Sequence, residues 1–574
     1  MKQLFTCILT GLLCSGALVA QPVANVCEPP SAYATIHANN IQAGLLNGGD
    51  LFWDLDEAQF IPNPIPGGFN PATIFAAGLW VGGIDPGGNL KLAAQTYRTN
   101  ETTDFWPGPL TTDGITEYQV CKNWDRFFSV KGKDIREFLE KLPTLAADPA
   151  AAIAQYPDIM GWPASGNAYF PGIWGFVLPN TPNGWAEFHD ADGDGVYDPL
   201  KGDYPVVAPE GKEVVPAEIF WCVFNDEGAG AVHSASLASP LLIEIQLTVW
   251  AFHCTDQPVL ENSVFTAHKI INRSTERIDS CMVGLWVDFD LGCYVDDFMG
   301  CDSALSAFFT YNEDPTDGST GAICTGGVTT FADNPPVQSV VLLNNPLHRF
   351  IYYENTSVGS PAPAVSDPDL PLEFYRYLNG HWRDGNPITY GGTGYQSGGA
   401  QANYAFPGDP ADPNAWSMCT ANLTAGDHRV VASSKAGSLL PGQSAELISA
   451  WTVHPDPDLP CGLGSMKNEI VQLRDTYQTG FAGVCSPLTG VSEIPVNRIR
   501  VFPNPASGTA TVTYGNLSVQ EIRLFSPDGR LARVLRNLEP EKTVLDLSGL
   551  ASGLYTVQLL SAKGTAVSKI SILK

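Results

Sequence analysis

The chain has 574 residues, more than one hydrophobic core normally serves, so we expect several domains. Glycine (56 residues) and proline (45 residues) are abundant, which favours a loop-rich β-protein over a helical one. The formal net charge is −29 at pH 7, and a strongly acidic surface repels phosphate backbones and anionic lipids. We therefore expect no nucleic-acid binding and no direct adhesion to lipid, whereas solubility and cation binding agree with the charge.

Residues 1–20 have the pattern of a secretory signal peptide. Lys2 supplies the positive charge, residues 4–19 are mostly apolar, and Ala20-Gln21 fits a cleavage site. The apolar run is too short for a membrane anchor, and no later segment is long and apolar enough to span a bilayer. We expect export and no transmembrane segment.

Cysteine usage agrees with an oxidising destination. Of 13 cysteines, two (Cys7 and Cys14) leave with the signal peptide. The remainder is odd, so at least one thiol is free or pairs with another molecule. Connectivity cannot be deduced from sequence, and the closest pairs, Cys293/Cys301 and Cys461/Cys485, are the first candidates for disulfides.

The fold class that the pattern predicts is mainly β, a β-sandwich-rich multidomain body with few short helices followed by a small immunoglobulin-like β-sandwich. We divide the mature body into an N-terminal β-rich region (21–205) with short helices and an antiparallel β-sandwich region (206–485), followed by a linker (486–497). The predicted strands cover residues 39–53, 73–82, 90–97, 242–252, 263–272, 281–289 and 445–453, with others near Val340 and Phe350. The predicted helices cover residues 134–142, 149–155 and 465–480.

Three of these predictions are specific enough to test. Asp134 is expected to cap its helix, and Pro143 to end it. Alternation of apolar and polar residues from 242 to 289 predicts an antiparallel meander with one face in solvent. Residues 311–427 are rich in Gly-Gly and Asp-Pro pairs and predict long loops, although so long a loop region suggests unrecognised elements.

An acidic loop after His189 has the spacing of a calcium site. Oxygen ligands stand at positions one, three, five and nine, a carbonyl at seven and Gly195 at six, as in the first part of an EF-hand loop. Position twelve is Lys201 rather than Glu, and Asp203 could close the shell instead. The predicted ligands are Asp190, Asp192, Asp194, the carbonyl of Val196, and Asp198.

This loop resembles the calcium loops of thrombospondin type 3 and dockerin-like segments more than a sensor. We expect a structural calcium ion bound in the weak extracellular range, with a dissociation constant of roughly 10⁻⁴ to 10⁻³ M. The alternative is a solvated Asp/Gly turn without an ion.

A second possible acidic site consists of Asp288, Asp290, Asp296 and Asp297. These carboxylates could share a cation, or two of them could do general acid/base work. The alternative, which we favour, is a disulfide-closed loop from Cys293 to Cys301 in which the aspartates cap backbone amides.

No catalytic signature is found, so the sequence predicts no catalytic residue and no organic cofactor. The Gly-x-Ser-x-Gly elbow, the His-Glu-x-x-His helix, the phosphate-binding loop and the Cys-x-x-Cys zinc pair are all missing. Tryptophans are frequent in the front half, where exposed rings would offer stacking platforms for sugars and buried rings would serve the core. These are Trp53, Trp80, Trp106, Trp162, Trp174, Trp185 and Trp221.

The C-terminal segment, residues 498–574, is built of short alternating strands separated by Gly, Pro, Asp and Ser. Ala510, Val512 and Tyr514 fall on one face of one strand, and Tyr555 and Val557, with Leu559, on one face of another. The segment opens on Phe-Pro-Asn-Pro-Ala, contains Asp-Leu-Ser-Gly-Leu-Ala-Ser-Gly-Leu-Tyr and ends on Lys-Ile-Ser-Ile-Leu-Lys. It closely resembles the type A C-terminal sorting domain of bacterial type IX secretion substrates.

The resemblance implies that residues 498–574 engage the type IX secretion machinery and a sortase. It implies removal of the sorting domain on export, with the body released or attached to surface polysaccharide. The expected location is therefore extracellular or on the outer-membrane surface, reached through the periplasm.

The body resembles a group of large secreted proteins that carry the same tail and have no assigned activity, over most of residues 36–480. We expect a non-catalytic binding, adhesin-like or structural body stabilised by calcium. The alternative is a secreted hydrolase that acts on polysaccharide or protein through carboxylates. The segments that carry the resemblance are residues 162–167, 192–199, 202–205, 224–226, 288–292, 296–297 and 300–302.

Overall fold

The structure is a computed structural model with two compact units, a body up to Val484 and a C-terminal unit from Cys485 to Lys574. The signal peptide expected at residues 1–20 and the linker expected at 486–497 lie outside the described residues. Residues 25–65, 68, 70–318, 324, 329–356, 362–455, 457–482, 484–485, 500–515, 519–526, 531–536, 538–561 and 564–573 are described.

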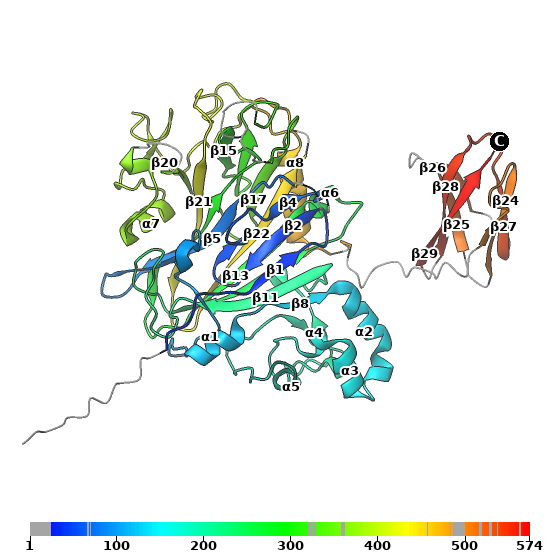
Figure 1. Cartoon of the computed structure of the whole chain (residues 1–574), viewed down its shortest axis with the longest axis horizontal. Helices are drawn as coiled ribbons and strands as arrows, with labels where there is room; N and C mark the ends of the chain where they lie inside the picture. The colour runs from blue at the N-terminus through cyan, green and yellow to red at the C-terminus, as the bar shows by residue number, and fades with distance from the viewer. Residues whose placement is uncertain are drawn as a thin grey trace, which may run out of the picture. The chain divides into compact units, whose positions relative to one another are not determined.

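The body contains two nine-stranded antiparallel sheets (Figure 1). The first sheet has the order β1-β2-β3-β5-β14-β21-β18, with β4 added to β2 and β6 to β5. Its strands are β1 (Tyr33–Ile36), β2 (Ile41–Leu46), β3 (Asp50–Leu51), β4 (Phe60–Pro62), β5 (Ala76–Ile84), β6 (Leu90–Ala94), β14 (Ile278–Asp288), β18 (Arg349–Glu354) and β21 (His428–Leu439).

The second sheet has the order β15-β16-β17-β22-β13-β12-β11-β7, with β8 added to β11. Strands from before and after residue 205 lie in both sheets, so the division expected at that residue does not separate two compact units. The strands of this sheet are β7 (Trp106–Pro107), β8 (Phe128–Lys131), β11 (Glu218–Asn225), β12 (Ile243–Ala251), β13 (Ser263–Asn272), β15 (Asp297–Asp302), β16 (Ala307–Asn312), β17 (Val337–Leu342) and β22 (Ser444–His454).

Apolar side chains join the two sheets into a sandwich. Phe52, just after β3, meets Trp451 of β22 edge to face with ring centroids 4.8 Å apart. Phe308 of β16 lies 5.8 Å from Phe350 of β18. Such aromatic pairs bury large areas and prefer these tilted geometries, so they fix how the two sheets face each other.

The expected meander over residues 242–289 is wrong in two respects. Strands β12 and β13 do pair, but β14 pairs with β5 and β21 in the other sheet. Both faces of β12 are almost entirely buried, because its outer face is covered, for example where the Gln246 side chain donates to the carbonyl of Gly184. The polar residues on one face of β12 therefore contact other polar groups of the protein, and they do not face solvent as expected.

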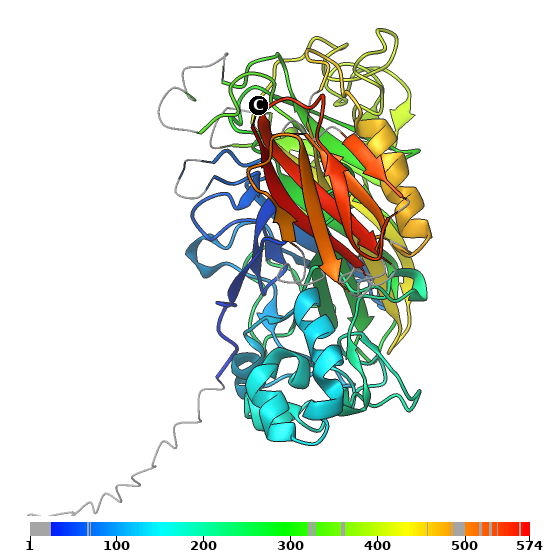
Figure 2. The ribbon, with the colours of Figure 1, turned by 90° about the vertical axis from the view of Figure 1, so that its right-hand side faces the viewer.

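Short helices lie outside the sheets, and α2 to α5 gather at one end of the body in both views (Figures 1 and 2). The helix expected over residues 134–142 begins earlier, at Gly132, and runs through Pro143 to Leu145; Asp134 does not cap it. The helices are α1 (Tyr118–Trp124), α2 (Gly132–Leu145), α3 (Pro149–Gln155), α4 (Pro157–Met160), α5 (Phe170–Trp174), α6 (Pro258–Glu261), α7 (Pro371–Leu378) and α8 (Met466–Gln478).

Short elements complete the body, and four of them (η5, α7, β19 and β20) lie in the region expected to be loops. Helix α7, between residues 311 and 427, covers the first sheet, with Phe374 4.9 Å from Trp80 of β5. The two-stranded pairs are β9 (Phe188–His189) with β10 (Tyr204–Pro205) and β19 (Ile388–Thr389) with β20 (Gln401–Ala402). The 3₁₀ turns are η1 (Thr99–Glu101), η2 (Pro199–Lys201), η3 (Pro209–Gly211) and η5 (Pro363–Val365).

The C-terminal unit is a small β-sandwich, as expected. A three-stranded sheet (β23-β24-β27) and a four-stranded sheet (β26-β25-β28-β29) enclose one apolar cluster. The predicted inward faces are confirmed, because Ala510, Val512, Tyr514, Tyr555, Val557 and Leu559 are all buried. The strands are β23 (Arg500–Phe502), β24 (Thr509–Gly515), β25 (Val519–Phe525), β26 (Leu531–Leu535), β27 (Glu541–Asp546), β28 (Gly553–Ser561) and β29 (Gly564–Ile572).

Disulfides connect distant parts of the body rather than neighbouring cysteines. The bonds are Cys27–Cys121, Cys293–Cys324 and Cys419–Cys461, and Cys254 and Cys485 are also disulfide-bonded. The pairs Cys293/Cys301 and Cys461/Cys485 are therefore wrong, because Cys301 lies inside β15 with its thiol toward the Ala405 carbonyl. The free thiols among the described residues, Cys222, Cys281 and Cys301, are buried.

The Cys27–Cys121 bond joins two buried cysteines that are 94 positions apart in the sequence. Replacing both cysteines with alanine is expected to lower the free energy of unfolding by about 3–5 kcal/mol, because the unfolded chain regains the entropy of an open loop. Denaturant unfolding of the mature chain measures this loss. Adding a reductant should weaken the wild type and leave less difference between the two proteins; equal stability under oxidising conditions would contradict the prediction.

Candidate functional site

The predicted calcium loop brings three of its five candidate ligands together. One carboxylate oxygen from each of Asp190, Asp192 and Asp194 lies within 4.8 Å of the others. Asp190 accepts hydrogen bonds from the amides of Gly193 (2.7 Å) and Gly195 (2.8 Å). Both glycines have a φ of +74°, which a side chain would strain, so the turn that collects the carboxylates depends on glycine.

The other two candidates, Val196 and Asp198, are used differently. The amide of Val196 donates to Asp194 Oδ1, and the Asp198 side chain caps the turn η2 by accepting from the amide of Leu200. Asp203, considered as a closing ligand, is buried and accepts from the amides of Ala191 and Asp198. Asp203 thus anchors both ends of the loop.

A basic side chain lies beside the loop carboxylates. Lys201 Nζ is 3.3 Å from Asp192 and 3.3 Å from Asp194. Hydrogen bonds to these two groups raise the pKa of Lys201, so its charge is secured by the same carboxylates that would bind an ion. Amide donors lower the pKa of Asp190, first of all the amide of Gly195, so this carboxylate stays ionised.

The loop is fixed to the body by its own residues. The buried Tyr197 donates through its hydroxyl to the carbonyl of Ile159, and its amide donates to the carbonyl of Ser165. Val196 lies against Gly166, where an added Cβ would approach to 2.8 Å. A change in the conformation of the loop would therefore alter its contacts with residues 159–166.

The second acidic site does not form one site. Three of its four carboxylates divide between two groups, and Asp297 belongs to neither. Asp288 and Asp290 group with Asp427, and Asp296 groups with Asp317 and Cys293. The aspartates that sequence reasoning missed, Asp317 and Asp427, come from distant segments, so spacing along the chain could not find them.

Asp288 is held by a network that crosses the first sheet. It lies opposite Arg429 in the β14–β21 register, and Arg429 Nε is 3.2 Å from Asp288 Oδ1, although without the alignment of a hydrogen bond. The hydroxyl of Tyr97 donates to Asp288 and accepts from Arg429 Nη2 at 2.8 Å. Arg429 also pairs with Asp427, whose second oxygen accepts from the amide nitrogen of Asn355 at 2.7 Å.

These residues line a pocket of about 400 Å³. Leu55, Asp56 and Thr99 at the pocket are exposed, so it reaches the surface. Aromatic rings form much of the wall, where Tyr97 packs edge to face with Trp53 and Phe75. The complete lining is Trp53, Leu55, Asp56, Phe75, Tyr97, Thr99, Asp288, Asp290, Tyr294, Asn355, Asp427 and Arg429.

The carboxylates that surround Arg429, those of Asp288, Asp290 and Asp427, have raised pKa values. Burial raises the pKa of Asp288 to about 7, although Arg429 opposes the shift. Burial and the nearby Asp288 raise the pKa of Asp290 well above its usual range. Three carboxylates share one guanidinium, so the pocket is short of positive charge.

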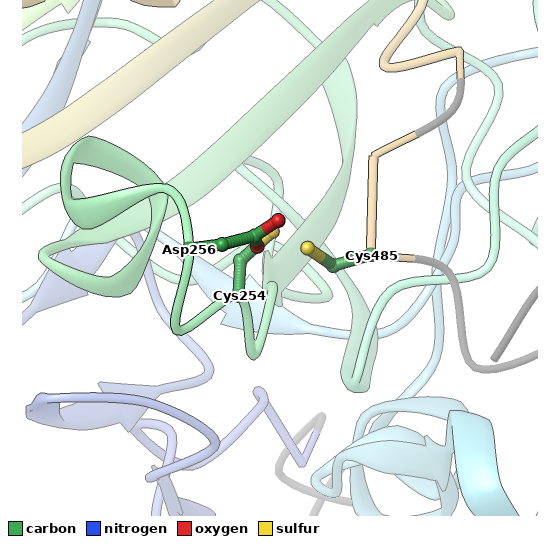
Figure 3. Close-up of side chains that lie close together, drawn as sticks. All are labelled: Cys254, Asp256 and Cys485. Atoms are coloured by element: carbon green, nitrogen blue, oxygen red, sulfur yellow. The ribbon is translucent and has the colours of Figure 1, made fainter. Parts of the chain in front are cut away.

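The remaining group of cysteines and acids is not a metal site. Cys254, Asp256 and Cys485 offer atoms within 4.8 Å of one another (Figure 3). Both cysteines are disulfide-bonded and offer no thiolate. Thiolate is the form of cysteine that binds metals, so this group does not fit a metal ion.

The tryptophans considered as sugar platforms are mostly in the core. All except Trp174 are buried, and Trp174 donates through its indole nitrogen to the carbonyl of Gly161. Trp124 and Trp185 stack with their ring centroids 5.2 Å apart. Packing rather than exposure is the main fate of these rings.

The comparisons with known proteins identify the C-terminal unit. Residues 500–573 match the secretion system C-terminal sorting domain. The chain is therefore a type IX secretion substrate that is exported to the cell surface or the extracellular space. Among the described residues, no helix combines the length and apolar character needed to cross a bilayer.

Comparisons of the chain with curated proteins and with solved structures support no functional inference. No curated protein matches the chain. Among solved structures, the sulfur carrier protein SoxY from Chlorobium limicola f thiosulfatophilum covers 18% of this chain and 92% of its own, at 14% identity and a TM-score of 0.13. A polysaccharide lyase covers 57% of this chain and 34% of its own, at 10% identity and a TM-score of 0.16. Scores this low carry no inference about fold or function.

Deleting residues 498–574 is expected to leave the protein in the periplasm, because the body then lacks the unit that the secretion machinery recognises. Immunoblots of periplasm, cell surface and medium measure the distribution. As a control, residues 486–574 fused behind an exported fluorescent protein should carry that reporter outside. Surface display of the truncated chain at the normal level would contradict the assignment.

Proposed function

We propose that the body is a non-catalytic surface-binding protein that captures positively charged groups in the pocket around Asp290. The observation that carries the proposal is an open, aromatic-walled pocket in which three carboxylates share the single guanidinium of Arg429. Such a pocket attracts a cation by charge and receives it against aromatic faces.

The carboxylates are arranged for binding rather than for acid/base work. Asp288 and Asp427 are both paired with Arg429, and Asp288 also accepts from the hydroxyl of Tyr97. Their orientation is therefore fixed by the protein. Asp290 is left to meet a ligand, together with the exposed Asp56 of the lining, because no hydrogen bond or ion pair joins either carboxylate to another side chain among the described residues.

The ligand class follows from the lining. A primary amine or guanidinium, as on a lysine-rich or arginine-rich protein segment or an amino sugar, matches both the carboxylates and the rings of Trp53, Phe75 and Tyr97. The pocket volume of about 400 Å³ suits a side chain or one sugar residue rather than a folded domain. This chemistry fits a protein displayed outside the cell, where such groups occur on other surfaces.

Calcium in the loop of residues 190–203 is the proposed stabiliser of the body. Asp190, Asp192 and Asp194 already converge, and ordering of the loop would be passed to the body through Tyr197. Lys201 partly neutralises the carboxylates and would have to swing away on binding. This competition supports weak affinity of the extracellular kind.

Attachment after export is the remaining part of the proposal. We infer that a sortase removes the sorting domain and that the body is released or linked to surface polysaccharide. The support is the match of residues 500–573 to the sorting domain.

A hydrolase of polysaccharide or protein is the second candidate, and one observation favours it. Asp290 lies beside Asp288 and has a raised pKa, which is the property of a general acid. A screen of glycan and protein substrates, with Asp290→Asn as the inactive variant, would reveal such an activity. Turnover that Asp290→Asn abolishes would replace the binding proposal.

Removing the charge of Asp290 tests the pocket. We expect Asp290→Asn to weaken binding of an end-capped tetralysine peptide roughly tenfold, the change that follows from losing about 1.4 kcal/mol of charge pairing. Isothermal titration of the mature full-length chain measures it. The matched control is Asp113→Asn, an exposed aspartate outside the pocket lining, which should bind like the wild type. The proposed binding site would be refuted if Asp290→Asn bound tetralysine as tightly as the wild type does. It would also be refuted if the wild type bound a tetraglutamate peptide as tightly as tetralysine.

The same titration should depend on pH. Because the pKa of Asp288 is raised to about 7, its carboxylate gains a proton as the pH falls below that value. The groups that act on it are Arg429, Asp427, Tyr97 and Asp367. Affinity for tetralysine is therefore expected to fall between pH 8 and pH 6, and affinity unchanged over this range would count against the carboxylates as the recognition element.

Removal of calcium tests the loop. At calcium concentrations about 10 to 100 times the expected dissociation constant, binding stabilises the folded state by about 1.4–2.7 kcal/mol. A chelator should therefore lower the melting temperature of the mature chain, and the paired substitution Asp192→Asn with Asp194→Asn should reduce that decrease. If the chelator lowered the melting temperature of this variant by the same amount, calcium would not stabilise the protein through this loop.

A further inference from the structure

A second group of acids is buried beneath the turn that follows β14. Asp296, Asp297 and Asp317 are 0%, 4% and 3% exposed. Asn312, at the end of β16, is fully buried beside them in the register and lies directly opposite Asp297. Three carboxyl groups and one amide thus share a dry part of the body.

Asp296 and Asp297 each accept a hydrogen bond through only one carboxylate oxygen. Asp296 Oδ2 accepts from the amide of Gly318 (2.7 Å) and Asp297 Oδ2 accepts from the amide of Leu291 (3.0 Å). In both residues the other oxygen, Oδ1, is buried without a hydrogen-bond partner. An unpaired buried polar atom costs free energy, and two unpaired carboxylate oxygens cost more than neutral groups would.

Asn312 repeats the pattern. Its Nδ2 donates to the carbonyl of Asp314 at 3.0 Å, which orients the amide, and its Oδ1 has no hydrogen-bond partner. Directly opposed residues on an antiparallel pair project from the same face, so the Asn312 and Asp297 side chains lie on one face. In both Asn312 and Asp297, Oδ1 accepts no hydrogen bond.

The local charge is uncompensated. Asp288 has Arg429, but among the described residues no ion pair joins Asp296, Asp297 or Asp317 to a basic side chain. Burial first of all, and then the neighbouring Asp317, raise the pKa of Asp296 to about 7. Either protons or a cation must offset this charge.

The geometry around Asp317 favours a cation. Its two oxygens accept from the amides of Cys293 (2.9 Å) and Phe331, which holds the carboxylate as an acceptor. An added Cβ on Gly292 would lie 1.9 Å from Asp317 Oδ2, so the carboxylate sits where only glycine admits it. Asp317 and Asp296 offer oxygens within 4.8 Å of each other, and each oxygen keeps a lone pair for a ligand.

We propose that Asp296 and Asp317, whose oxygens already converge, hold a buried calcium ion. Asp297 lies outside the group that converges within 4.8 Å, so its unpaired Oδ1 and that of Asn312 would have to turn toward the ion to complete an all-oxygen shell. Hard oxygen donors of this kind, with several carboxylates and an amide carbonyl, are the ligands of calcium in proteins. Cys293 is not a ligand, because it is disulfide-bonded to Cys324. The site is separate from the loop of residues 190–203 and from the pocket of Asp290, and it goes beyond the function proposed above.

Counting bound ions tests the proposal on the mature full-length chain. Calcium-45 equilibrium dialysis of calcium-depleted protein should find two ions in the wild type. The exposed double substitution Asp192→Asn with Asp194→Asn should remove one and retain the other. Adding Asp296→Asn, or Asp317→Asn, to that background should remove the second ion, and near-ultraviolet circular dichroism verifies that each variant is folded.

The controls separate this site from the others. Asp113→Asn, the exposed aspartate outside the pocket, and Glu313→Gln, a neighbouring acid outside the proposed shell, should leave the number of ions unchanged. If the loop variant keeps no ion, or if Asp296→Asn and Asp317→Asn keep the same ion, the proposal is overturned. Because the loop variant changes only exposed side chains, its result stands even where a buried variant fails to fold.

Discussion

The structure depends on how the carboxylates buried in the body are paired, hydrogen-bonded or neutralised. A buried carboxylate must be paired, hydrogen-bonded or neutralised, because desolvation strongly disfavours the charged form. At Asp288 a guanidinium is supplied by the opposite strand, and at Asp203 backbone amides serve both oxygens. At Asp296 one oxygen has an amide and the other has nothing. This difference separates structural acids from acids that are available to a ligand.

The strands that create these sites explain why the acids meet. β14 ends at Asp288, and the chain then turns and enters the other sheet at β15, so residues 289–296 connect the two layers. Asp288 and Asp290, at the start of this connection, line the pocket with Arg429 of β21, and Asp296, at its end, lies with Asp317. The sorting domain places the chain outside the cell, where a positively charged surface or a calcium ion is accessible to it.

Much of this architecture was readable from the sequence, and the rest was not for identifiable reasons. Turn residues and period-two strands predicted the sorting domain, and the acidic spacing predicted the convergence of Asp190, Asp192 and Asp194. The pairing of distant strands was not predictable. Arg429 lies 141 residues from Asp288, and its strand was not recognised because the loop-like composition before it gave no strand signal. Disulfides failed for the same reason, because sequence proximity of Cys293 and Cys301 says nothing about which strands bring sulfur atoms together.

We propose that a cation balances the uncompensated carboxylates of this exported body. The most direct measurement is an X-ray structure of the mature chain crystallised with calcium, with anomalous data that locate the ion. We predict an anomalous peak between the carboxylates of Asp296 and Asp317, with oxygen distances of roughly 2.3–2.6 Å. A well-ordered map with no peak there, and with those carboxyl groups bonded to each other or to water, would contradict it.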